Sequence, residues 1–133
     1  MSDPTALGAD QRLALADRFR LGLTTAAWDL IRSLLTDDVV WTLPGDNTVS
    51  GTVRGAAAVI ERIRLIASYG VHFDFRHTLL SRDNLALSLH NTAERDGRVL
   101  DEHLATVCFL HGERIGAIET YVSDVPGMNA FFV

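Results

Sequence analysis

The stretch that decides the fold runs from residue 72 to residue 122 and reads HFDFRHTLLSRDNLALSLHNTAERDGRVLDEHLATVCFLHGERIGAIETYV. Apolar and polar residues alternate along it, and short turn signals interrupt it at Asp83-Asn84, Asp96-Gly97 and Gly112-Glu113. A period of two is typical of β-strands, and an Asp-Gly pair between two such runs is a strong hairpin signal. The stretch therefore predicts an antiparallel meander of four strands.

Two-residue turns would fix the register of this meander. His77 then lies opposite His90 across the first hairpin, and His90 lies opposite His103 across the second. Side chains alternate sides along a strand, so the three histidines share one face. On the same arithmetic that face also carries Phe73, Phe75, Leu79, Ser88, Thr92, Ala105, Val107, Phe109, Ile118 and Thr120.

The opposite face of the predicted sheet is rich in leucine. It carries Leu85, Leu87, Leu89, Leu104, Leu110, Ile115 and Tyr121, with Asn91, Thr106 and Glu119. Because both faces are too apolar for water, one should meet helices and the other a second subunit. We therefore expect a homodimer through the outer sheet face, with Leu87, Leu89, Leu104 and Tyr121 in contact. A one-residue slip in any hairpin would move the later histidines to the other face.

Composition limits the class of protein. A chain of 133 residues with 47% hydrophobic and 22% charged residues is typical of one globular domain, residues 1–133, large enough for a core and a pocket. The net charge of −5 and the scattered basic residues argue against nucleic acid as a partner. The start lacks a signal-peptide pattern and no apolar run reaches membrane-spanning length, so we expect no membrane contact and a cytoplasmic location. Cys108 stands alone and is interpreted as a buried, inert thiol.

The first half of the chain predicts helices that can cover one face of the sheet. After a loose arm at residues 1–9, three apolar stripes have the spacing of helix faces. They are Leu15-Phe19-Leu23, Trp28-Ile31-Leu35 and Val59-Ile63-Ile66. Between the last two stripes, residues 39–43 predict a strand that ends at Pro44-Gly45. Helices followed by a curved meander make an α+β plan.

Four segments of this plan point to a known family. They are the Asp37-Asp38-Val39-Val40-Trp41 start of the first strand, the crossing from Pro44-Gly45 to Arg54-Gly55, the Arg95-Asp96-Gly97-Arg98 hairpin and the closing segment from Asp124 to Phe132. With them the chain, from about residue 10 to residue 132, resembles the SnoaL-like branch of the nuclear-transport-factor-two-like superfamily. The resemblance implies a cystatin-like α+β barrel, in which a cone-shaped, curved antiparallel sheet wraps around N-terminal helices and leaves an internal pocket.

The family includes polyketide cyclases, ketosteroid isomerases, limonene-epoxide hydrolases and proteins that only bind ligands. The position of the isomerase base is occupied here by Leu43, so that aspartate is missing. The positions of the epoxide-hydrolase Arg-x-Asp and last-strand Asp are occupied by His90, Thr92 and Thr120. His103 matches the histidine of the SnoaL-type cyclases, while no carboxylate matches their aspartate, because Glu119 falls on the other predicted face.

The three histidines and the family's catalytic positions fall on one predicted face. We therefore predict His90, His103 and His77 as catalytic residues of a cavity. The predicted ligand-binding residues are Trp28, Trp41, Phe75, Thr92 and Thr120. Apolar walls would keep the imidazoles neutral, so that one could take a proton while a neighbour donates a hydrogen bond to an oxyanion.

The predicted function is cofactor-free acid/base isomerisation or cyclisation of a small hydrophobic, carbonyl-bearing or polycyclic molecule. Two alternatives remain open: a non-catalytic small-molecule-binding protein with the same cavity, and an epoxide-hydrolase-like enzyme. For each histidine a purely structural role also remains open. Three imidazoles on adjacent strands resemble a three-histidine zinc site as well, but without a second shell of partners we assign no metal and no cofactor.

Overall fold

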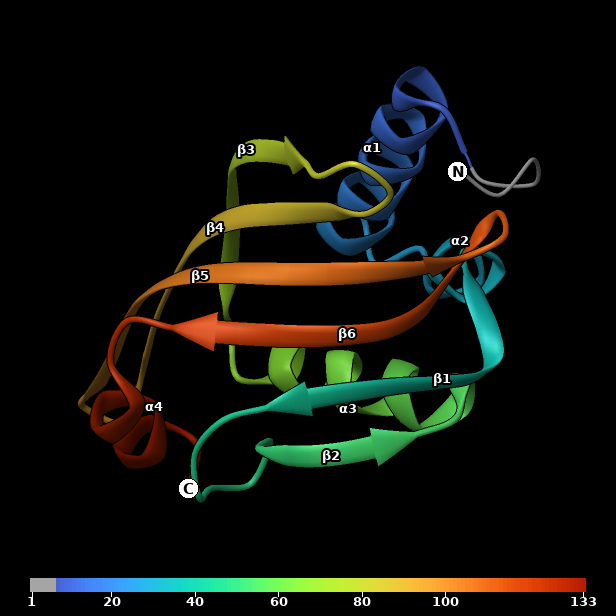
Figure 1. Ribbon diagram of the computed structural model, residues 1–133. Coiled ribbons are helices and arrows are strands. Elements are labelled where there is room, and N and C mark those ends of the chain that lie inside the picture. Colours follow the sequence, from blue (N-terminus) through green and yellow to red (C-terminus); the bar gives the residue numbers. More distant parts are fainter. Residues whose placement is uncertain (1–6) are drawn as a thin grey trace.

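The computed structural model describes residues 7–133 and shows a curved, open sheet of six strands with helices against one face (Figure 1). The elements are α1 (Ala9–Thr24), α2 (Trp28–Ser33), β1 (Leu35–Leu43), β2 (Gly51–Arg54), α3 (Ala56–Ser68), β3 (His72–Leu80), β4 (Leu85–Arg95), β5 (Arg98–His111), β6 (Arg114–Val122) and α4 (Val125–Phe131). The strand order is β2-β1-β6-β5-β4-β3. The predicted α+β fold is confirmed, although β1 and β6 form one parallel pair.

The predicted helical stripes are buried against the sheet. The buried side chains include Leu15 and Phe19 of α1, Ile31 of α2, and Val59, Ile63 and Ile66 of α3. Helix α2 ends at Ser33, so Leu35 of the second predicted stripe starts β1 instead. Residues 1–6 of the predicted arm lie outside the described residues, and α1 begins at Ala9. No helix within residues 7–133 has the length and hydropathy needed to cross a membrane.

The β4–β5 hairpin has the predicted register. Its turn residues, Asp96 and Gly97, both have positive φ, at 53° and 77°. Such a two-residue turn matches the right-handed twist of the flanking strands. His90 therefore lies opposite His103, as predicted. Asn91 lies opposite Glu102 in the next pair along the same two strands.

The β3–β4 hairpin departs from the predicted register. Its turn has four residues, 81–84, and a bulge between Phe75 and His77 shifts the pairing once more. His77 consequently lies opposite Ser88. The predicted pairing of His77 with His90 is therefore wrong, because it assumed a two-residue turn and an unbroken ladder.

A bulge in the β5–β6 hairpin also changes the face of later residues. The Gly112-Glu113 turn is as short as predicted, but Gly116 is skipped in the pairing. A Cβ atom at Gly116 would lie only 3.0 Å from the Cβ of His111, so glycine suits this close approach. The bulge brings Thr120 to the leucine side of the sheet and moves Tyr121 to the histidine side.

The leucine face of the sheet, and not the histidine face, meets the helices. Leu85, Leu87 and Leu89 are only 2%, 1% and 5% exposed, and they belong to the core. Burial of one leucine side chain is worth about 1.5–3 kcal/mol, so a row of leucines outweighs imidazoles in the choice of face. The assignment of Leu87, Leu89 and Leu104 to an outer surface is therefore wrong.

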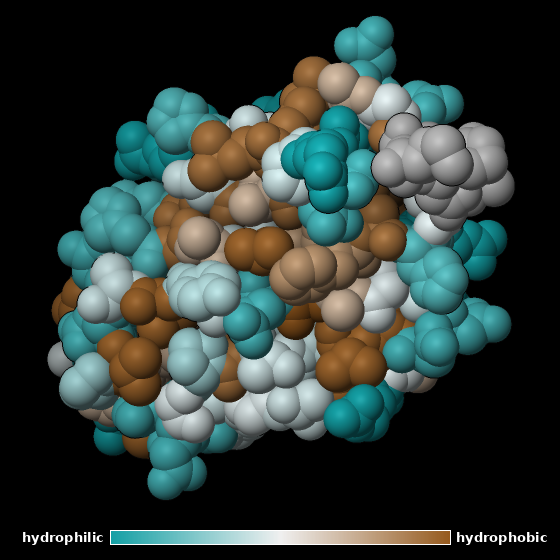
Figure 2. Space-filling view, viewed as in Figure 1, coloured by the Kyte–Doolittle hydropathy of each residue, from teal (hydrophilic) through white to brown (hydrophobic). Residues whose placement is uncertain are grey.

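The outer face of the sheet exposes apolar side chains of a different set. Leu79, Phe109 and Tyr121 are 52%, 46% and 57% exposed. Figure 2 shows this face, with apolar side chains over much of its middle and polar side chains toward its rim. Large apolar patches of this kind occur where proteins associate.

Candidate functional site

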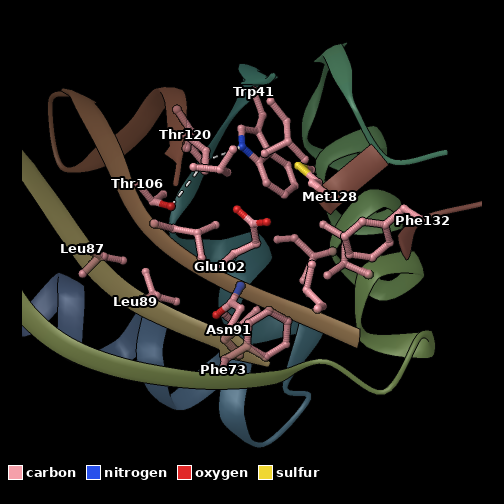
Figure 3. A pocket seen from close by; sticks show the side chains of 18 of the residues that line it. Trp41, Phe73, Leu87, Leu89, Asn91, Glu102, Thr106, Thr120, Met128 and Phe132 are labelled. Atoms are coloured by element: carbon pink, nitrogen blue, oxygen red, sulfur yellow. Dashed lines mark hydrogen bonds between the residues drawn. The ribbon is translucent and has the colours of Figure 1, made fainter. Parts of the chain in front are cut away.

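An apolar pocket lies between the leucine face of the sheet and the helices (Figure 3). Its apolar wall includes Phe19, Ile63, Leu87, Met128 and Phe132, from four helices and strands and the segment after α4. The space open to the centres of water molecules is about 80 Å³. One buried water needs roughly 10–15 Å³ on that measure, so the pocket can hold several waters or one small organic molecule.

Two polar residues interrupt the apolar wall at adjacent positions of β4 and β5. Asn91 continues the row of Leu87 and Leu89, and Glu102 lies directly opposite Asn91. They are 8% and 2% exposed. Figure 3 shows both side chains directed into the pocket, with the Glu102 carboxyl group near its centre.

The Glu102 carboxyl group is held at one oxygen by the start of α4. Its Oε1 accepts a hydrogen bond from the Asp124 backbone N–H at 2.9 Å. Asp124 also caps α4, because its Oδ1 accepts a hydrogen bond from the Gly127 N–H at 3.0 Å. A Cβ at residue 127 would lie 2.3 Å from the Asp124 carboxylate, so glycine keeps this cap in place. The cap therefore positions the amide that orients Glu102.

Burial raises the pKa of Glu102. The hydrogen bond from the Asp124 amide is the next largest influence and lowers the pKa, the negative charges of Asp124 and Asp101 raise it, and the Ser123 hydroxyl lowers it slightly. A carboxyl group in an apolar site keeps its proton to higher pH, because burial disfavours the charged form. Glu102 can therefore exist as acid or as base nearer to neutral pH than an exposed glutamate.

Asn91 presents an acceptor without a partner. Its Oδ1 is buried and makes no hydrogen bond to any of residues 7–133. An unsatisfied buried acceptor costs about 1–3 kcal/mol. A bound molecule with a donor group would remove that cost.

The far wall carries a chain of hydrogen bonds that ends at two threonines. Trp41 Nε1 donates to Thr120 Oγ1 at 3.0 Å, and Thr120 Oγ1 lies 3.3 Å from Thr106 Oγ1 (Figure 3). The Arg62 guanidinium lies 5.0 Å from the Trp41 ring and donates to the Gly51 carbonyl at 2.9 Å. Burial lowers the pKa of Arg62. These contacts hold the indole in place in the pocket wall.

The predicted ligand-binding residues divide into two groups. Trp41 and Thr120 line the pocket. Trp28 and Phe75 pack against the core but do not line the pocket. Thr92 follows Asn91 on β4 and therefore faces the outer side of the sheet. The prediction that these last three contact the cavity is wrong.

The predicted catalytic histidines lie on the outer face of the sheet. His90 and His103 stack there, with ring centroids 4.3 Å apart and planes inclined by 7°. His90 Nε2 donates a hydrogen bond to Asp101 Oδ1 at 2.5 Å, and this bond lowers the pKa of Asp101. His77 is exposed on the same face but outside the stack. The three residues therefore do not face the pocket, contrary to prediction.

The stacked histidines and Asp101 also have the side-chain types that bind metal ions. One possible ligand atom from each residue lies within 4.8 Å of the others. The two rings are nearly parallel, however, so their nitrogen lone pairs run side by side and do not converge on one point. Arg76 Nη2 also approaches His90 Nδ1 at 3.4 Å. We assign no metal centre to this cluster.

Sequence reasoning missed Asn91 and Glu102. A signal for both was present in the leucine rows, because each replaces a leucine in an alternating pattern: Leu85-x-Leu87-x-Leu89-x-Asn91 and Leu100-x-Glu102-x-Leu104. A polar residue that continues a row of core residues is buried, and it then needs a hydrogen-bond partner in the protein or in a bound molecule. The predicted hairpin register would have placed the two opposite each other.

Comparisons with known proteins support the fold. No protein-family model matches the sequence, and no curated protein sequence matches it with significant similarity. Bal32a, from a soil-derived mobile gene cassette, has 22% identity and a TM-score of 0.87 over 94% of this chain and 98% of its own.

An NTF2-like protein from Burkholderia xenovorans has 14% identity and a TM-score of 0.80, over 95% of this chain and 98% of its own. A candidate ketosteroid isomerase from Kribbella flavida has 19% identity and a TM-score of 0.69, over 86% and 79%. Identities this low show the fold and not the activity. The chain thus has the NTF2-like, cystatin-like α+β fold that its sequence predicts.

Proposed function

We propose that the pocket binds a small, mainly apolar molecule with a carbonyl group, and that Glu102 moves a proton on it in a cofactor-free isomerisation or cyclisation. One observation carries the proposal: a carboxyl group with a raised pKa is buried among apolar side chains of a pocket. Titratable groups in such surroundings are frequently functional. The candidate isomerase among the solved structures of this fold is consistent with the same chemistry.

The proton transfer is complete without a cofactor. The Glu102 carboxylate takes a proton from the carbon next to the carbonyl, and the C–H electron pair moves into an enolate. The same carboxyl group returns the proton to a different carbon, which gives the isomer. In a cyclisation, the enolate carbon instead attacks a second carbonyl of the same molecule, which forms a C–C bond and an alkoxide, and the alkoxide takes the proton back from the carboxyl group. A base whose pKa is nearer the working pH is the more effective.

The threonine pair can stabilise the negative oxygen that forms. The bond between Thr120 and Thr106 uses only one of their two hydroxyl hydrogens. The other is available to an oxygen in the pocket, and a positioned donor of this kind stabilises an oxyanion. Glu102, Thr106 and Thr120 therefore supply a base and an oxyanion donor on neighbouring strands.

A non-catalytic ligand-binding role is the second candidate. Glu102 is the one titratable side chain among the described residues that line the pocket. Hydrolysis of an epoxide needs both an acid and a group that activates water, so a single carboxyl group supports that reaction less well. Binding without chemistry requires only the apolar wall and the polar contacts.

The experiment uses proton exchange as its readout. Wild-type protein is mixed with a small β,γ-unsaturated ring ketone, such as 3-cyclohexenone, in D₂O, and isomerisation and deuterium uptake are followed by NMR. We expect Glu102→Gln to lower the rate by about 100-fold or more. Glu119→Gln, an exposed glutamate on β6, is the matched control and should leave the rate unchanged. Ligand binding without wild-type exchange would favour the non-catalytic role.

We also propose that two copies of the chain pair through the outer sheet face, with Phe109 and Tyr121 in contact. Their exposure on an apolar surface supports this arrangement. Sedimentation at micromolar concentration should show a dimer, and Tyr121→Asp should shift it toward monomer. A monomeric wild-type protein would contradict the proposal. The cytoplasmic location stays a prediction from the sequence.

A further inference from the structure

We infer that the ligand of this pocket carries a hydroxyl or N–H group that donates a hydrogen bond to Asn91 Oδ1, while the carbon next to the ligand carbonyl lies at Glu102. The inference rests on the proposed function, because it concerns the same pocket. It narrows the ligand to small ketones with a donor a few ångströms from the carbonyl. Asn91 then determines specificity and does not take part in the proton transfer.

The first support is the unsatisfied acceptor itself. Asn91 is 8% exposed, and its Oδ1 has no hydrogen-bond partner among residues 7–133. An asparagine in a row of buried leucines destabilises the fold if it serves packing alone, because buried polar groups are as a rule hydrogen-bonded. The neighbours Leu87 and Leu89 show that the strand tolerates leucine at the equivalent positions.

The second support is the position of Asn91 relative to Glu102. The two residues are direct cross-strand partners, whose Cβ atoms lie about 5 Å apart. No hydrogen bond joins their side chains, and Glu102 Oε1 is bonded to the Asp124 amide instead. Both side chains are thus directed into one pocket, and one ligand of moderate size can reach them together (Figure 3).

The third support is that the unsatisfied atom of Asn91 is a hydrogen-bond acceptor. An amide carbonyl oxygen can only accept, so only a donor on the ligand satisfies it. Trp41 Nε1, the indole donor in the wall, already bonds to Thr120. A ligand that has a carbonyl but no donor, and that displaces water from the pocket, leaves Asn91 Oδ1 unsatisfied. Sites that are built to bind a hydroxyl group discriminate strongly against the analogue without it.

The experiment compares two ligands of nearly equal size. Calorimetry measures the binding of 3-hydroxyacetophenone and of 3-methylacetophenone, in which a methyl group replaces the hydroxyl. We expect the wild-type protein to bind 3-hydroxyacetophenone at least about 10-fold more tightly than 3-methylacetophenone. Asn91→Leu should reduce that preference to less than about twofold. Thr92→Val, the next residue on the opposite face, is the matched control and should retain it.

Thermal unfolding separates a ligand contact from a structural one. Leucine at position 91 extends an existing leucine row and removes the unsatisfied acceptor, so Asn91→Leu should raise the Tm. If Asn91 has a purely structural role, the same substitution should instead lower the Tm.

Two results overturn the inference. Equal binding of the two ketones to wild-type protein would mean that water alone satisfies Asn91, even if Glu102→Gln abolishes proton exchange. If neither ketone binds and no exchange occurs, the proposed function fails as well.

Discussion

Asp101 and Glu102 are consecutive residues of β5 whose side chains lie on opposite faces of one sheet. Burial raises the pKa of Glu102 in the pocket. On the outer face, the hydrogen bond from His90 lowers the pKa of Asp101. Two carboxyl groups of nearly the same chemistry thus have pKa values that are shifted in opposite directions. Surroundings, and not residue type, decide which of them suits proton transfer to an apolar ligand.

Their partners on β4 show the same division. Glu102 lies opposite Asn91, which is buried, while the next pair, His90 and His103, stacks at the surface. Histidines that the sequence suggests as catalytic residues can therefore lie on the side of a strand that faces away from the pocket. The two faces should therefore differ in stability, in chemistry and in their response to pH.

The largest difference should appear when the same substitution is made on each face. Leu87→Ala removes a side chain that is 1% exposed, and we expect a loss of about 2–5 kcal/mol in the free energy of unfolding. Leu79→Ala removes one that is 52% exposed on the outer face, and surface changes are usually within about 0.5 kcal/mol. Urea unfolding measures both. Equal losses would contradict the assignment of the two faces.

The second difference should appear in the proton-exchange assay. The double variant His90→Gln with His103→Gln should keep the wild-type rate within about twofold, because both rings lie outside the pocket. Glu102→Gln should reduce that rate by about 100-fold or more. A large loss in the histidine variant together with an unchanged rate for Glu102→Gln would restore the histidines as catalytic residues and remove Glu102.

The fold was predictable from the sequence because its main signals are local. The Asp96-Gly97 turn fixed the central register, and the helix stripes at Leu15 and Val59 identified the elements that cover the sheet. The side of the sheet on which some residues of β3 and β6 lie was not predicted correctly, because a bulge at Arg76 puts Phe73 and Phe75 on the leucine side and a bulge at Gly116 exchanges the sides of Thr120 and Tyr121. A bulge has a weak sequence signal, since one extra residue leaves the apolar pattern nearly intact.

The site was missed for a related reason. The predicted pairing of His90 with His103 is correct, as the stack of their rings shows. The cavity was then assigned to their face by resemblance, although Leu85, Leu87 and Leu89 made the opposite face the stronger candidate for the core. Of the predicted ligand-binding residues, Trp41 and Thr120 line the pocket. Hydrophobic burial is the larger free energy, so it should be assigned before catalytic residue types are considered.

The smallest difference should appear in the pH dependence of stability. The folded-state pKa of Glu102 is raised above its ordinary value of 4.5. Its protonated form therefore contributes stability that is fully present below that value and is lost as pH rises through the raised pKa. The pKa of Asp101 is lowered from 3.8, so its ionised form contributes stability above that value that is lost as pH falls through the lowered pKa.

These signs give each carboxyl group its own pH window. Glu102→Gln should flatten the decline in stability above pH 4.5, and Asp101→Asn should flatten the loss of stability below pH 3.8. If Glu102 is the base, the rate of proton exchange should rise with pH over the same window in which its contribution to stability falls, because both follow its ionisation. Unfolding by urea and exchange by NMR, measured across that range, test this link. A rate that rises with pH in a window where Glu102→Gln has no effect on stability would assign the base to another group.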